Sequence, residues 1–345
     1  MTCIGLYCNF HFHIQEQWVP LATDVGNCFK IFITYIGASI YFKTFSERET
    51  QRFLILCGKS IVALVYIMFV FAIINGLGNI GMGQDIRYGI HSFSFIFDGE
   101  ANFLMTFYLL VPMLIFSLKT YKMKKQLWMI ILVGVIYVST LRSRAFVYVL
   151  VLCVLFYYMI YRNKQFHLNW RNILLFSFGA IYICYDQIKL YTDIDNGQTA
   201  RYALLINGFD IAKELFPVGY GFGTYGTDVA AKFYSVLYDQ LGFNNVYGLS
   251  QDFSAFARDD YWPAILGQFG FIGLIIFGLC LYCLFKDMFV KSKDKYLKLI
   301  AILVCFSLCL SSTADAAFFH YVTVCSMFFL AFIFNSKKTL KFGLK

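Results

Sequence analysis

Long apolar runs separated by short polar segments dominate the chain. A helix needs about 20 apolar residues to cross a bilayer, and nine runs approach this length. They are residues 29–42, 53–77, 101–118, 127–141, 145–161, 173–190, 262–285, 296–314 and 316–334. Because spanning helices satisfy their own backbone hydrogen bonds in lipid, the pattern predicts an all-α integral membrane protein with about nine transmembrane helices. We expect residues 1–345 to form one polytopic membrane domain.

The longest interruption of this pattern is the segment 191–261, which is too long for a simple connector and is expected to be functional. Thr199 can cap a helix over residues 200–215, which Pro217 would end. Apolar residues recur there at helical spacing and give one apolar face, suited to the membrane surface or to the helix bundle. They are Tyr202, Leu205, Phe209, Ala212 and Phe216. The segment therefore predicts a large loop with a short amphipathic helix.

Basic residues assign a side of the membrane to each connection. Lysine and arginine concentrate in one set of connections, a bias typical of the cytoplasmic side. The set comprises residues 43–52, 119–126, 162–171, 286–295 and 337–345. Segment 191–261 and the short turn at 142–144 then lie outside, with the N-terminus outside and the C-terminus inside. The polar segment 1–28 is interpreted as a remnant of a larger N-terminal region or as the result of a misassigned start.

Composition agrees with a membrane protein and excludes several other classes. The chain is 59% hydrophobic and 14% charged, whereas a soluble domain is about a quarter charged. The net charge of +9 is dispersed over many short loops, so it does not indicate nucleic-acid binding. Most of the 11 cysteines lie within apolar runs, where packing is the expected role. The His11-x-His13 pair alone is weak evidence for a metal, so no metal site and no cofactor is predicted.

The arginines point to an external anion. Arg142 and Arg144 oppose the usual charge bias, and five of the nine arginines fall on the external side. A guanidinium binds phosphate through a planar fork, whereas lysine acts as a point charge. A lipid diphosphate is therefore one candidate ligand. The alternative is that these arginines reach lipid headgroups or pair with external acids.

Two further features of segment 191–261 are candidates for a substrate site. The run Pro217–Gly226 holds glycines that permit positive φ and close backbone approach to a ligand, namely Gly219, Gly221, Gly223 and Gly226. Its aromatics, including Tyr225, either anchor at headgroup depth or stack on sugars. At the end of the segment, Asp259 and Asp260 form a carboxylate pair beside Arg258. Either carboxylate is a candidate general base, and the alternative is a solvated charge pair.

The order of these elements resembles the O-antigen polymerase and O-antigen ligase superfamily. The shared order is a short external turn with arginine, a basic cytoplasmic hairpin, a large external loop with a glycine run, and a polar pair entering a span with Gly270-x-x-Gly273. The resemblance covers roughly residues 130–285. It implies metal-independent, inverting transfer of undecaprenyl-diphosphate-linked glycans at the outer face of a bacterial cytoplasmic membrane. Arg142 or Arg144, with Arg201, would hold the diphosphate.

The resemblance also suggests which reaction to expect. Ligases of this superfamily have a histidine where Asp259 stands here, so the chain fits a polymerase better, with Asp259 or Asp260 activating the acceptor sugar. The product would be O-antigen, capsular or exopolysaccharide. Expected partners are the bilayer, the lipid-linked glycan, and a chain-length regulator and flippase of the same pathway. Ligation remains an alternative. A flippase or transporter is disfavoured because mid-span ionisable residues are few and no internal repeat is present.

Overall fold

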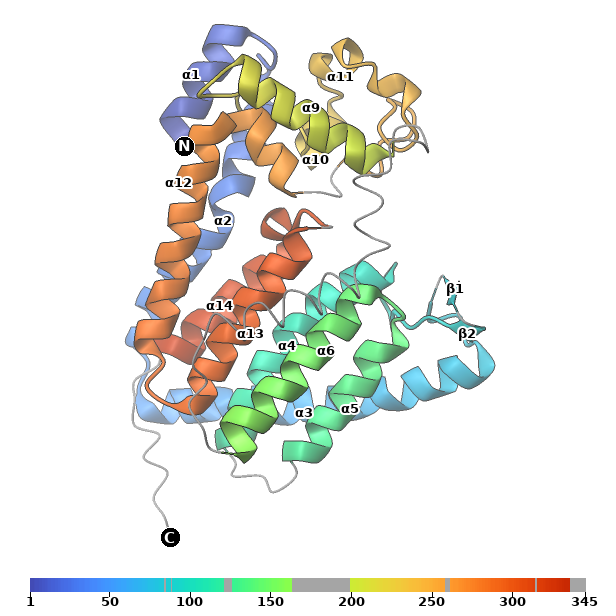
Figure 1. Ribbon diagram of the computed structural model, residues 1–345. Coiled ribbons are helices and arrows are strands. Elements are labelled where there is room, and N and C mark those ends of the chain that lie inside the picture. The colour runs from blue at the N-terminus through green and yellow to red at the C-terminus, as the bar shows by residue number, and fades with distance from the viewer. Residues whose placement is uncertain are drawn as a thin grey trace. The chain divides into compact units, whose positions relative to one another are not determined.

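A computed structural model of the protein describes residues 1–83, 85–87, 89–120, 126–162, 199–257, 261–313 and 315–335. Figure 1 draws these residues as coloured ribbons, and their regular secondary structure is nearly all α-helix. The helices are α1 (Thr2–Phe12), α2 (Trp18–Lys43), α3 (Glu47–Gly78), α4 (Glu100–Thr120), α5 (Gln126–Ser139), α6 (Ser143–Phe156), α9 (Ala200–Glu214), α10 (Asp228–Lys232), α11 (Val236–Gln240), α12 (Tyr261–Lys291), α13 (Lys295–Ser312) and α14 (Tyr321–Asn335). A short antiparallel hairpin pairs β1 (Ile86–Arg87) with β2 (Ile90–His91).

Six helices in the described ranges are long and apolar enough to cross a membrane. They are α2, Arg48–Gly78 of α3, Glu100–Leu118 of α4, Ser143–Ile160, α12 and α13. Apolar stretches in α5 and α14 are shorter. Each predicted span within the described ranges contains a helix, and the span at 173–190 lies outside those ranges. The nearly all-α fold is thus confirmed and is consistent with a helical membrane protein, while the count of nine stays a prediction.

The chain forms two compact units, each assembled from segments far apart in sequence. Unit 1 contains Met1–Phe32, Tyr185–Lys286 and Leu308–His320. Unit 2 contains Ile33–Cys184, Asp287–Ser307 and Tyr321–Lys345.

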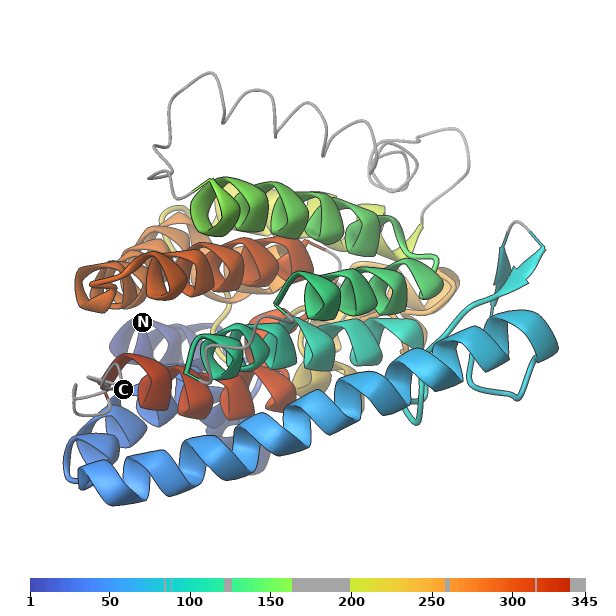
Figure 2. The ribbon, with the colours of Figure 1, turned by 90° about the horizontal axis from the view of Figure 1, so that it is seen from below.

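Unit 2 is a bundle of apolar helices. Helix α3 packs against α4 and α5, and α4 also packs against α14. Figure 2 shows α3 as the long light-blue helix that extends along these neighbours. Ser46 caps α3, and its hydroxyl accepts a hydrogen bond from the Glu49 backbone N–H in a capping box. The ring of Phe42 lies 4.9 Å from that of Phe328 and 5.0 Å from that of Phe332, so aromatic packing joins the end of α2 to α14.

Unit 1 contains the folded part of the predicted loop. Helix α9 begins after Thr199, whose hydroxyl accepts from the Tyr202 backbone N–H at 3.3 Å, so the predicted helix and its cap are confirmed. Of the predicted stripe only Ala212 is buried, and the rest of the buried face consists of Ala200, Ala203, Leu204, Gly208 and Ile211. Phe209 and Phe216 from that stripe are exposed, which leaves the predicted contact with a membrane surface untested.

The N-terminal segment is an integral part of unit 1. Helix α2 begins at Trp18 rather than at residue 29, and α1 precedes it. The buried Asn9 side chain of α1 binds both backbone groups of Phe222. Its Oδ1 accepts from the Phe222 N–H at 2.7 Å, and its Nδ2 donates to the Phe222 carbonyl at 2.9 Å. The glycine run 217–226 is therefore held by a helix that lies about 200 positions earlier in the chain.

Candidate functional site

Helix α12 is broken at Gly270, which adopts φ 62° and ψ −161°. The rings of Tyr261 and Phe277 lie 5.2 Å apart, although sixteen positions of continuous helix would separate them by about 24 Å. The first limb of α12 (residues 261–269) thus folds back on the second limb (residues 271–291). Figure 1 shows the orange ribbon turning at its upper end. The second limb alone covers about 30 Å, which is enough to cross a bilayer.

The glycine run supplies the hydrogen bonds that the broken helix lacks. Backbone N–H groups of Tyr220 and Gly221 donate to the carbonyls of Gly267 and Gln268, at 3.0 Å and 2.8 Å. In the opposite direction, Ile272 N–H donates to the Pro217 carbonyl at 3.1 Å. Irregular backbone at membrane depth is tolerated only where its polar groups find partners within the protein. The loop and the break therefore form one structural element.

Three of the four glycines named from the sequence adopt positive φ, and in the structure the close backbone approach is to the protein itself. Gly221, Gly223 and Gly226 have φ values of 98°, 70° and 66°. A Cβ added to Gly219 would lie 2.4 Å from the Gly267 carbonyl oxygen. Tyr225, predicted as a substrate-loop residue, is fully buried, and its hydroxyl donates to the Leu204 carbonyl at 2.6 Å. In this arrangement Tyr225 belongs to the hydrophobic core of unit 1.

A second buried tyrosine fixes the end of the glycine run. The hydroxyl oxygen of Tyr238 accepts a hydrogen bond from the Gly226 N–H at 2.9 Å. Burial raises the pKa of Tyr238, because the phenolate would be desolvated. The hydroxyl consequently stays protonated and serves as a structural contact.

Sequence reasoning missed Asp24, an acid within the candidate span α2. Its side chain is fully buried. Oδ2 accepts from the Gly223 backbone N–H and from the Gln268 side-chain amide, each at 2.8 Å. The available signal was a carboxylate within an apolar segment, which marks a functional candidate by its desolvation cost. The signal was lost because residues 1–28 were assigned to a region outside the first span.

Arg142, the predicted diphosphate ligand in unit 2, is surrounded by carboxylates. It is the N-cap residue of α6, in the short connection after α5. Its Nη2 lies 2.6 Å from Glu100 Oε2 and 3.0 Å from Asp85 Oδ2. The Glu100 side chain is 1% exposed and accepts a hydrogen bond from the Ser92 hydroxyl. Arg87 reaches the same Asp85 oxygen at 3.3 Å.

The sequence left open that the external arginines pair with acids. Arg142 does pair with two acids in the structure, Glu100 and Asp85. The pairs engage only one terminal nitrogen, however, and the Arg142 side chain remains 30% exposed. Its Nε is buried and has no hydrogen-bond partner within the described part of the chain. Arg144 is half-buried in the first turn of α6 and has interactions of its own. The Arg142 guanidinium is therefore held by carboxylates, while its Nε–H donor makes no hydrogen bond in the described part of the chain.

The remaining predicted site residues are distributed differently. Arg201 lies in the first turn of α9, in unit 1, and is half-buried with interactions of its own. Arg258, Asp259 and Asp260 lie outside the described residues. The structure therefore describes Arg142 and Arg201 in different units. The role of the carboxylate pair stays a prediction.

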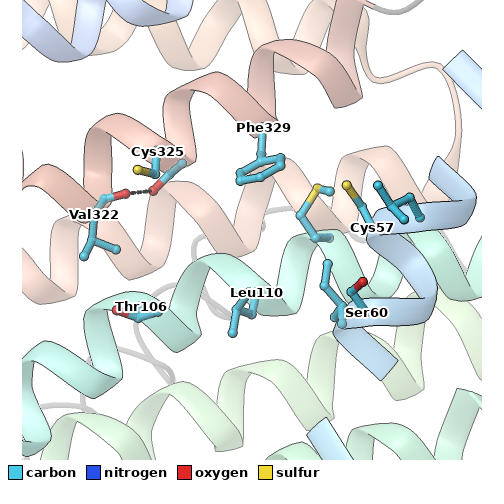
Figure 3. A pocket seen from close by; sticks show the side chains of 11 residues that line it. Cys57, Ser60, Thr106, Leu110, Val322, Cys325 and Phe329 are labelled. Carbon is cyan, nitrogen blue, oxygen red and sulfur yellow. Dashed lines mark hydrogen bonds between the residues drawn. The ribbon is translucent and has the colours of Figure 1, made fainter. Parts of the chain in front are cut away.

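A pocket of about 340 Å³ lies among helices of unit 2. Figure 3 shows side chains of α3, α4 and α14 around it. The lining residues are Leu56, Cys57, Ser60, Ile61, Thr106, Leu110, Met113, Val322, Cys325, Ser326 and Phe329. The hydroxyls of Thr106 and Ser326 donate to backbone carbonyls of their own helices, at 3.0 Å and 2.6 Å. These two groups are therefore satisfied, and most of the remaining surface is hydrocarbon and sulfur, which suits an apolar chain.

In the described ranges, no group of three or more His, Cys, Asp or Glu residues is arranged to hold a metal ion. Comparison of the chain with protein-family models, with characterised proteins and with solved structures finds no significant match.

Proposed function

We propose that the protein is a membrane glycosyltransferase that polymerises undecaprenyl-diphosphate-linked oligosaccharide repeat units at the outer face of the bacterial cytoplasmic membrane. The observation that carries the proposal is Arg142. A partly exposed guanidinium stands at the start of an apolar helix, and the buried Glu100 holds it at 2.6 Å. The N-terminus of a helix favours anions. The charge bias of the connections favours the external side for this turn.

Arg142, held by Glu100 and Asp85, supports a role in stabilising the leaving group. As the glycosidic bond breaks, negative charge grows on the diphosphate, and a fixed guanidinium lowers the energy of that state. The diphosphate would compete with Asp85, whose side chain is 39% exposed, for the Arg142 donors. Glu100 would remain in place as a positioning residue. The polyprenyl chain of the donor would occupy the apolar pocket lined by Cys57 and Cys325, which belongs to the same unit.

The proposed step needs no metal. An acceptor sugar hydroxyl attacks the anomeric carbon of the donor, and the bond from that carbon to the diphosphate oxygen breaks with inversion. The hydroxyl proton passes to Asp259 or Asp260, and the polyprenyl diphosphate leaves as an anion held by arginine. The resemblance assigns Arg201 to the same diphosphate, and its contribution is tested separately by substitution. Transfer of glycan to a different carrier would use the same chemistry, so ligation remains an alternative.

A lipid-linked glycan transporter is the second candidate, and two observations favour it. The break in α12 at Gly270 and the buried acid Asp24 in a candidate span are features that transporters use at substrate and ion sites. Transport would move the glycan across the membrane without forming a new bond, whereas polymerisation lengthens it.

Deletion of the gene, followed by gel analysis of surface glycan, separates these functions. Loss of a polymerase leaves single repeat units at the cell surface or on their lipid carrier. Loss of a ligase leaves polymer that is not attached to its acceptor, and loss of a transporter leaves no external glycan. A normal ladder of glycan lengths in the deletion strain would contradict all three assignments.

A further inference from the structure

The Asp24 carboxylate is a buried charge without an ionic partner. It lies in the candidate span α2 and is 0% exposed. Within the described residues, no lysine or arginine forms an ion pair with it. The two donors at hydrogen-bond distance, the Gly223 N–H and the Gln268 amide, both point at Oδ2, and the Thr227 side chain also interacts with the carboxylate. Burial of a charge is costly unless another charge compensates it.

Two oxygen atoms at this position have no donor. A carboxylate only accepts hydrogen bonds, so Gln268 presents its NH₂ group to Asp24, and its Oε1 takes no part in that hydrogen bond. Both Asp24 Oδ1 and Gln268 Oε1 are buried and lack a partner in the part of the chain that the structure describes. Two acceptors cannot satisfy each other. The Tyr261 hydroxyl, also buried and without a hydrogen-bond partner there, interacts electrostatically with Asp24.

The local charge is negative. Asp228 and Lys30 interact electrostatically with Asp24, which makes two carboxylates against one ammonium. Lys30 Nζ donates instead to the Asn27 side-chain oxygen at 2.9 Å. Gln268 also lies in the last turn of the first limb of α12, and the C-terminal end of a helix carries partial negative charge. A hard cation of single charge would balance the carboxylate and coordinate both unpaired oxygens.

We propose that Asp24 and Gln268 bind one monovalent cation, such as Na⁺, at the break in α12. The ion would join α2 to α12 and, through the Gly223 hydrogen bond, to the glycine run. The proposal does not depend on the enzymatic or transport activity of the protein.

The test uses the full-length protein, purified in detergent without alkali cations. Thermal unfolding is measured in NaCl, KCl, LiCl and choline chloride at equal ionic strength, and binding of radioactive Na⁺ is measured directly. We expect one or more alkali cations to raise the unfolding midpoint saturably over choline, since a ligand that binds only the folded state stabilises it. Equal midpoints in all four salts, together with no saturable Na⁺ binding, would overturn the proposal.

Asp24→Asn is the critical variant, because asparagine keeps the shape and an acceptor for Gly223 but removes the charge. We expect it to abolish the cation-dependent shift. Asp287→Asn is the matched control, a carboxylate on α12 that accepts from the Tyr35 hydroxyl at 2.8 Å, and should keep the shift. A full shift in Asp24→Asn would overturn the proposal. If Asp24→Asn does not fold, Na⁺ binding to the unaltered protein decides. Stabilisation that depends on acidity alone, with no alkali cation bound, would assign a proton to Asp24 and also overturn it.

Discussion

The guanidinium of Arg142 lies 2.6 Å from the carboxylate of Glu100, and the Glu100 side chain is 1% exposed. These residues come from α6 and α4, which are separated by the whole of α5. Breaking a buried pair leaves an uncompensated charge and costs about 3–5 kcal/mol. The pairing therefore both stabilises unit 2 and holds the arginine that the proposed diphosphate would use.

The first prediction concerns this pair. Glu100→Gln keeps the size of the side chain and an acceptor for the Ser92 hydroxyl, but it removes the charge that faces Arg142. Asp85 retains a contact with Arg142, so we expect a loss of roughly 1–3 kcal/mol in the free energy of unfolding. Denaturant unfolding in detergent measures it. Asp85→Asn, at a position 39% exposed, should cost less than about 1 kcal/mol. Equal losses in the two variants would contradict the account.

The second prediction concerns the type of positive charge. Arg201→Lys should lose most polymer, and at least one of Arg142→Lys and Arg144→Lys should do the same, because lysine cannot span two phosphate oxygens. The readout is glycan length on gels from cells that express each variant at the normal level. Arg162→Lys, in a connection assigned to the cytoplasm, is the control and should give glycan of full length. Full length in all three test variants would reject the diphosphate role.

The third prediction concerns sidedness. The charge bias puts segment 191–261 outside and 286–295 inside. The glycine run is a poor position for a label because Phe222 and its neighbours are buried, whereas Gln251 and Lys293 are exposed. In a background without native cysteines, Gln251→Cys in intact cells should react with an impermeant maleimide, and Lys293→Cys should not. Labelling at Lys293→Cys but not at Gln251→Cys would show that the true topology is the inverse of the predicted one.

The fourth prediction concerns the contact between the glycine run and α1. Gly221 has φ 98°, and an added Cβ would lie 2.5 Å from Asn9 Oδ1. Gly221→Ala should therefore cost at least about 2 kcal/mol of unfolding free energy. Gly26→Ala is the matched control, because Gly26 lies within α2 with no atom near the added Cβ. It should be neutral or slightly stabilising. A loss for Gly221→Ala as small as that for Gly26→Ala, measured by denaturant unfolding, would show that the run tolerates a side chain at 221.

The fold was predictable where local pattern decides it. Apolar runs indicated the helices, and Thr199 and Pro217 bounded α9 because capping and the missing proline N–H act over a few residues. The break at Gly270 was not predicted, since the apolar pattern runs through it without interruption. The chain folds back there only because the glycine run supplies the missing hydrogen bonds from about 50 positions away.

The candidate site was predictable in residue type but not in partners. Arg142 was identified from its charge and position, yet its pairing with Glu100 joins residues 42 positions apart. Asp24 was missed for a similar reason, because its contacts with Gly223 and Gln268 depend on tertiary packing. Its role as a buried acid became visible only once α2 was seen to begin at Trp18.

Polymerisation without a metal and with a carboxylate base can be measured in a purified system. Purified protein is incubated in EDTA with undecaprenyl-diphosphate repeat units, and product length is read on a gel. We predict a ladder of polymer from the unaltered protein, and only single repeat units from Asp259→Asn or from Asp260→Asn, with donor binding retained. If the unaltered protein makes no polymer in EDTA and magnesium or manganese restores polymer, the result would contradict the account. Polymer of wild-type length from both asparagine variants would also contradict it.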